Sequence, residues 1–173
     1  FPQVLKDLAG KYVPSLLNGN GSGHHKDSGS SPKNEEQGTT EEAAKAAADH
    51  PQVKGLKAVG YASSGLYEYL CPQSGLKCWR IRMDHPSPEQ NPKWIASLSF
   101  INGKWELKEP SFPYGKPLYI QKSEESSESS NIFYLFEGER KVDLAVKLGL
   151  SAVTSGSSTS AARANWEPLR GYS

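Results

Sequence analysis

Apolar and polar residues alternate along the middle of the chain, and this alternation predicts a sheet. Successive side chains of a strand point to opposite faces, so a strand with one buried face shows a period of two. The segments with this period are 57–61, 66–70, 76–84, 93–101 and 104–108. Asn102 and Gly103 separate the last two segments and favour a two-residue hairpin turn. We therefore expect a small antiparallel meander.

The third of these segments carries a hydrophobic face and a charged face. Its alternation places Trp79, Ile81 and Met83 on one side. Arg80 and Arg82 lie on the opposite side. Basic side chains can bind phosphates, and tryptophans can stack on unpaired bases. The alternative is that the tryptophans belong to the core of the meander and that the arginines form a solvated face. We favour this alternative for the tryptophans and leave both possibilities open for the arginines.

The C-terminal part changes to an alternation of strands and helices. Residues 132–136 form an apolar run of strand length, residues 139–148 show helical spacing, and Gly149 can end that helix. We expect a second strand at 151–154 and, after a small-residue loop, a second helix at 161–169. This order is typical of the start of a doubly wound sheet, whose buried parallel strands appear as continuous apolar runs.

Acidic residues follow the first of these strands. Ligands of open α/β sheets bind beyond the carboxyl ends of the strands, where Glu137 is expected, and Gly138 allows a tight turn there. Glu139 and Asp143 come next, one helical turn apart, and carboxylate oxygens suit Mg²⁺. The alternative is structural. Acids are stabilised at a helix N-terminus, and Asp143 can pair with Lys147 one turn later.

The composition divides the chain into five segments. They are the end of a preceding segment at 1–17, a disordered linker with a short helix at 18–56, a β-rich segment at 57–122, a linker at 123–131 and an α/β unit at 132–173. The linkers lack the apolar surface that would offset the entropy cost of ordering them. Thr39 and Glu42 match a capping box before an alanine-rich helix, which we expect to pack lightly and to end at His50 and Pro51.

Charge and apolar content restrict the possible partners. The chain of 173 residues has 36% hydrophobic residues and a formal net charge of +1, so nucleic-acid binding would need a local basic patch. Residues 76–122 offer one, with eight Lys or Arg against four Asp or Glu. We find no apolar run of membrane length and no signal peptide pattern, and we expect no membrane partner.

Two cysteines raise the question of a zinc site. Cys71 and Cys78 are followed by His85, but the close Cys-x-x-Cys pairs of most structural zinc sites are absent. His24 and His25 stand in the linker without metal-binding neighbours. We therefore do not expect zinc within this chain.

The C-terminal segment resembles the first half of a TOPRIM domain, the fold of bacterial-type primases, topoisomerases and some nucleases. Residues 133–139 are similar to the apolar strand and Glu-Gly-Glu turn of phage and plasmid primases and primase-helicases. Residues 148–150 match their Leu-Gly-Leu ending, and residues 152–154 match the next strand. Lys141 stands where an acid is common in the family, and Asp143 can substitute for that acid.

The resemblance extends along the chain in both directions. After the second strand, the glycine and serine loop at 155–160 and then Trp166, Pro168, Leu169 and Gly171 continue the pattern. The family's following strand ends in an Asp-x-Asp motif that completes the metal site, and the chain ends before that motif. We therefore expect a fragment that is inactive by itself. The β-rich segment is similar, more loosely, to the segment that precedes TOPRIM in such primases.

This resemblance implies an α+β fold, in which a small antiparallel β segment precedes the first half of a parallel, doubly wound TOPRIM domain. It implies that Glu137 is the metal-linked acid or general base, with Glu139 and Asp143 as further catalytic candidates. The candidate nucleic-acid-binding residues are Arg80, Arg82, Arg140 and Lys141.

The activity implied by the resemblance is the synthesis of RNA primers on single-stranded DNA for replication. The expected cofactor is Mg²⁺, with Mn²⁺ as a substitute. The expected partners are the single-stranded DNA template, nucleoside triphosphates and a replicative helicase, fused or separate. The expected location is the cytoplasm of a bacterial or phage-infected cell. Two alternatives stay open, a TOPRIM nuclease or topoisomerase and a non-catalytic nucleic-acid-binding β module.

Overall fold

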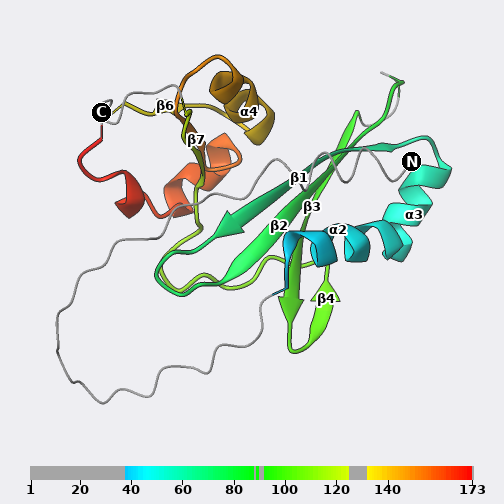
Figure 1. The fold of residues 1–173 in the computed structure, drawn as a ribbon. Coiled ribbons are helices and arrows are strands. Elements are labelled where there is room, and N and C mark those ends of the chain that lie inside the picture. Colours follow the sequence, from blue (N-terminus) through cyan, green and yellow to red (C-terminus); the bar gives the residue numbers. More distant parts are fainter. Residues whose placement is uncertain (1–37, 88, 90–91, 125–131, 173) are drawn as a thin grey trace.

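The computed structural model describes residues 38–87, 89, 92–124 and 132–172. Within them the fold is α+β, with one antiparallel sheet and one mixed sheet (Figure 1). The predicted preceding segment at 1–17 and most of both predicted linkers, including His24 and His25, lie outside the described residues.

The antiparallel meander predicted from the alternating pattern is confirmed. Its strands pair in the order of the chain and are β1 (Ala62–Leu70), β2 (Lys77–Asp84), β3 (Lys93–Ile101) and β4 (Lys104–Glu106). The hairpin between β3 and β4 has Asn102 at φ 51° and Gly103 at φ 76°. Two successive positive φ angles are the requirement of the turn that this dipeptide predicts.

The strand predicted at 57–61 is wrong, because a helix ends at Ala58 and a turn follows at 59–60. Helix α3 (Pro51–Ala58) follows directly on α2 (Thr40–Asp49). His50, expected to end one helix, also begins the next, since its Nδ1 accepts a hydrogen bond from the Gln52 N–H at 3.2 Å. Proline is favoured at the first position of a helix, where its missing N–H costs nothing.

The two helices cover one face of the antiparallel sheet, and α2 packs more closely than expected. Ala43 of α2 and Val53 of α3 are buried against Trp79 and Met83 of β2. The small alanine side chains let α2 approach closely, and the Trp79 indole N–H donates to the Thr40 hydroxyl at 3.1 Å. Residues 39–58 therefore belong with the sheet rather than with the preceding linker.

The second sheet is mixed and has the strand order β5-β7-β6. β6 (Tyr134–Leu135) runs parallel to β7 (Ala152–Thr154), and α4 (Glu139–Lys147) connects them. β5 (Tyr119–Gln121) pairs antiparallel with β7, although the sequence placed it in the β-rich segment. The predicted helix at 139–148 and strand at 151–154 are confirmed with slightly different ends.

The strand predicted at 132–136 is shorter and less buried than expected. β6 has two residues, and Leu135 is 62% exposed. In the described sheet β6 is an edge strand with β7 as its neighbour, so its apolar side chains are not enclosed from both sides. A continuous apolar run indicates a strand, but it does not show which strands flank it.

The helix predicted at 161–169 is replaced by two short 3-10 helices, η1 (Ser158–Arg163) and η2 (Glu167–Leu169). Between them the backbone pairs with another segment. The Lys116 N–H donates to the Arg163 carbonyl at 2.9 Å, and the Asn165 N–H donates to the Lys116 carbonyl at 2.8 Å. These bonds use the backbone groups that a continuous helix would need.

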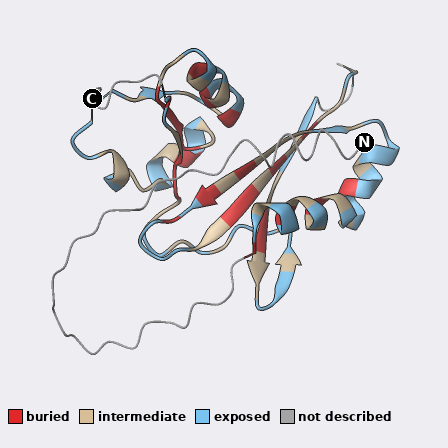
Figure 2. Cartoon of the chain, viewed as in Figure 1, coloured by how far each residue is buried: buried red, intermediate tan, exposed pale blue. Residues whose placement is uncertain are grey.

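Strand β2 lies between two layers. Its Trp79 side faces α2 and α3, and its opposite side faces the unit that contains α4 and β7, where Cys78 packs with Val142 and Ala152. Figure 2 shows buried residues along β1, β2 and β7. The charged face of β2, which could have been solvated, is therefore covered in part by α4.

Candidate functional site

Glu137 lies in the short connection between β6 and α4, with Phe136 between it and the strand and Gly138 between it and the helix. The strand is held up to this point by the Phe136 N–H, which donates to the Val153 carbonyl at 2.9 Å. The Glu137 side chain is 71% exposed, and Lys141 Nζ lies 3.3 Å from its Oε2, one turn along the helix. An exposed pair of this kind contributes little to stability, so this carboxylate can exchange its partner for a ligand at low cost.

Glu139, the first residue of α4, is buried instead. Its Oε1 accepts a hydrogen bond from Arg80 Nη1 at 2.9 Å and another from the Tyr69 hydroxyl at 2.5 Å. Burial and the neighbouring carboxylate raise the pKa of Tyr69, so it stays a neutral donor. Removing one partner of a buried ion pair costs about 3–5 kcal/mol, because the other charge is left uncompensated.

Asp143, one turn further along α4, faces β5. The Tyr119 hydroxyl donates to its Oδ1 at 2.8 Å, and the Tyr119 ring packs edge-on against the Tyr67 ring. Burial raises the pKa of the Asp143 carboxyl, against the lowering effect of the Tyr119 hydrogen bond. The three predicted acids thus have different surroundings, and of these Glu137 is the one most open to a ligand.

Three of the four predicted nucleic-acid-binding residues, Arg80, Arg82 and Arg140, form a row of ion pairs between β2 and α4. Asp84 Oδ1 lies 2.9 Å from Arg82 Nε, and its Oδ2 lies 2.8 Å from Arg140 Nη1. Together with the Arg80–Glu139 pair, these contacts tie two successive residues of α4 to the charged face of β2. The Arg80 side chain is 11% exposed and that of Arg140 58% exposed. Arg140 and Lys141 are therefore more accessible to phosphates than Arg80.

The side chains that could bind a metal are dispersed over the described part of the chain. Cys71 and Cys78 are buried free thiols, and burial raises the pKa of Cys78 to about 12. Within the described ranges no group of three or more His, Cys, Asp or Glu is arranged to hold a metal. Mg²⁺ is often bound by one or two carboxylates with water and substrate phosphates completing its shell. The exposed Glu137 carboxylate fits that kind of site as one ligand.

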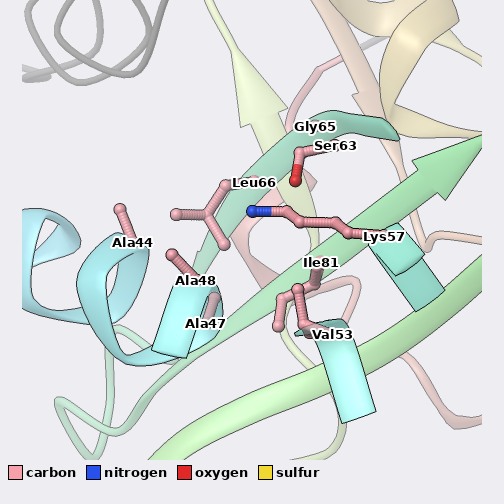
Figure 3. Close-up of a pocket in the computed structure, with 9 residues that line it drawn as sticks. All are labelled: Ala44, Ala47, Ala48, Val53, Lys57, Ser63, Gly65, Leu66 and Ile81. Atoms are coloured by element: carbon pink, nitrogen blue, oxygen red, sulfur yellow. The ribbon is translucent and has the colours of Figure 1, made fainter. Parts of the chain in front are cut away.

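A shallow apolar pocket lies elsewhere, between the two N-terminal helices and β1. Figure 3 shows Lys57 extending across it towards Leu66 and Ser63. Its lining consists of Ala44, Ala47, Ala48, Val53, Lys57, Ser63, Gly65, Leu66 and Ile81. None of the predicted site residues lines it, so it marks a gap left by small side chains rather than a second part of the acidic site.

Two residues of the buried contact between Arg80 and Glu139, Tyr69 and Gly156, were not predicted from the sequence. Tyr67 and Tyr69 do lie on one face of their strand. A Cβ at Gly156 would collide with Arg80 Nη1 and Tyr69 Oη. The alternating pattern indicated that the two tyrosines share a face of the strand. It could not indicate their contacts with residues more than fifty positions away in the chain.

Comparisons with protein-family models, with curated proteins and with solved structures each give no match. Among the residues that the structure describes, no helix is both long and apolar enough to cross a membrane. The case for a function therefore rests on the geometry around Glu137 and on the sequence motifs.

Proposed function

We propose that this chain is part of a TOPRIM-type DNA primase or primase-helicase, which synthesises RNA primers on single-stranded DNA with Mg²⁺. The observation that supports the proposal most is the parallel β6–α4–β7 unit with an exposed Glu137 at the carboxyl end of β6. A carboxylate in that position suits ligand and metal binding at the edge of an α/β sheet. The TOPRIM resemblance gives the reaction class.

In this proposal Glu137 contributes one metal ligand or accepts a proton from the primer 3′-hydroxyl. Lys141 leaves Glu137 when substrate binds and can then meet a phosphate oxygen. Bound Mg²⁺ would activate the hydroxyl and stabilise negative charge on the transferred phosphoryl group. Glu139 and Asp143 have structural partners, Arg80 and Tyr119, and we assign them no direct contact with the substrate.

Template binding is assigned to the accessible basic residues beside this acid. Arg140 and Lys141, on the first turn of α4, have side chains that are about 60% exposed. Each phosphate that such residues neutralise increases the dependence of DNA affinity on salt, so that affinity falls more steeply as the salt concentration rises. We expect single-stranded DNA to run past the first turn of α4 towards the Asp84 end of β2.

A non-catalytic nucleic-acid-binding module is the second candidate. The observation in its favour is that two of the three predicted acids, Glu139 and Asp143, are hydrogen-bonded within the protein. That module would bind single-stranded DNA through Arg140 and Lys141 and would not need Glu137. A TOPRIM nuclease or topoisomerase would use the same acid in strand scission.

The test compares the natural gene product that contains this chain with its Glu137→Gln variant. Wild-type protein is incubated with single-stranded DNA, ribonucleotides and Mg²⁺, and both primer synthesis and strand scission are followed. We expect priming, with a loss on the order of 100-fold in Glu137→Gln at unchanged DNA affinity. The matched control is Glu167→Gln, since Glu167 is also an exposed acid in a short-range ion pair.

Each other outcome selects another candidate. Scission without priming would replace the primase with a nuclease or topoisomerase. DNA binding with neither reaction, unaffected by Glu137→Gln, would leave the binding module.

A further inference from the structure

Arg80 contacts both of the loops that follow the parallel strands. Through its Nη1 it binds Glu139, immediately after the turn that follows β6. The same Nη1 lies against Gly156, in the loop that follows β7, so closely that a Cβ at that position would collide with it. One buried side chain from the antiparallel sheet thus reaches both loops at the carboxyl edge of the second sheet.

Glu137 depends on these contacts for its position. Before it, the chain is fixed by the hydrogen bond between Phe136 and Val153. After it comes Gly138, which has an extended backbone at φ −158° and no atom within 4 Å of where a Cβ would be. The Gly138 carbonyl accepts hydrogen bonds from the Lys141 and Val142 N–H groups at 3.1 and 3.3 Å, so the turn joins α4 directly. The first side chain of α4, Glu139, is in turn held by Arg80 and Tyr69. The glycine turn that carries Glu137 is therefore anchored at both ends.

We propose that Arg80 is a positioning residue, which holds Glu137 in place relative to the antiparallel sheet through Glu139 and the Gly156 loop. The catalytic role of Glu137 rests on the proposed function. The anchoring of the two loops by Arg80 does not depend on it. The proposal differs from the role suggested by the sequence, in which Arg80 binds template directly. The Arg80 side chain is 11% exposed, and its guanidinium is shared between a carboxylate and a tyrosine ring, so it has little surface left for a phosphate.

The kinetic test uses the intact gene product with the variants Arg80→Met, Glu139→Gln and the double variant. Displacing a reacting group by about 1 Å can cost on the order of 100-fold. We expect Arg80→Met to lower kcat for priming by that order, with template Kd changed less than about 2-fold. Glu139→Gln should lower kcat in the same manner, and the double variant should be no slower than the slower single variant, because both changes break one contact.

The double variant also controls for folding, because it leaves no uncompensated buried charge. Arg170→Met is the matched control, since Arg170 forms an exposed ion pair with Glu167. The Arg170→Met protein should prime at the wild-type rate. If Arg80→Met raises template Kd while Glu139→Gln does not, Arg80 binds template and the proposal fails. A double variant that primes at the wild-type rate would also overturn it.

A second measurement decides the anchoring without any catalysis. Amide hydrogen exchange is followed in the 173-residue chain, wild type against Arg80→Met, at hydrogen-bonded amides after each strand. After β6 these are Lys141 and Val142, which donate to the Gly138 carbonyl, and after β7 it is Gly156, which donates to Thr154 Oγ1. We expect exchange at both loops to rise by about 10-fold or more, and Arg170→Met to leave it unchanged. Unchanged exchange in Arg80→Met would refute the anchoring. If the wild-type protein does not prime, the proposed function fails, and this measurement still tests the role of Arg80.

Discussion

The two sheets are stabilised by different kinds of contact, although both pack against residues of strand β2. The antiparallel sheet and its helices enclose an apolar core around Trp79, Met83 and Leu98. The β5–β7–β6 sheet has a smaller core, and it is tied to β2 by the buried Arg80–Glu139 pair. An apolar core is held by non-directional packing, whereas a buried ion pair is stabilising only in a close geometry. The difference suggests that the first sheet is a scaffold and that the second sheet is positioned on it.

The largest effect on stability is expected from breaking the scaffold. Trp79 is fully buried, so Trp79→Ala should lower the free energy of unfolding by about 3–5 kcal/mol. Urea denaturation of the purified chain measures this. Trp105→Ala is the matched control, because Trp105 packs on the same cluster while partly exposed, and its loss should be smaller. Equal losses in both variants would contradict the assignment of Trp79 to the centre of the core.

A smaller effect is expected where the second sheet meets the scaffold. Gly156 has φ +91° and lies against Arg80, whereas Gly75 has φ +71° and open space around it. An alanine in the left-handed region costs about 1–2 kcal/mol. Gly75→Ala should lower the free energy of unfolding by that amount, as measured by thermal unfolding. Gly156→Ala should lower it further, because Arg80 and Tyr69 must also move. Equal losses would mean that the loop does not rest on Arg80.

The smallest effect is a pH dependence at Asp143. Burial holds its pKa above the ordinary 3.8 in the folded state, so the folded protein binds the proton more strongly than the unfolded chain. Ionisation then lowers stability as pH rises from the unfolded pKa through the folded one. Asp143→Asn removes this loss, and its melting temperature relative to wild type should increase between about pH 4 and pH 7. A relative melting temperature that decreases would contradict the direction of this shift.

The sequence predicted those elements whose evidence is local. Strands β2 and β3 and their faces follow from the alternation around Trp79, and the β3–β4 turn follows from Asn102 and Gly103. The tryptophans of the meander belong to its core, as favoured. The segment 57–61 was mistaken for a strand because so short an apolar run does not distinguish strand from helix.

The candidate site was predicted less completely than the fold. Glu137 lies at the strand end that the sequence indicated. The pairing of Arg80 with Glu139 joins residues 59 positions apart, and their charges alone suit solvent, nucleic acid or each other equally well. Only the packing of α4 on the charged face of β2 decides among these possibilities, and that packing is a tertiary property.

The most direct test of the account is extension of a short RNA primer already annealed to single-stranded DNA, measured in a single turnover with the intact gene product. Because the primer is already annealed, template selection does not contribute to the measured rate. The rate therefore reports on nucleotide addition, the step assigned to Glu137. The account predicts that wild-type protein extends the primer in Mg²⁺, that Glu137→Gln is slower on the order of 100-fold, and that Glu167→Gln is not. Extension by Glu137→Gln at the wild-type rate would contradict it.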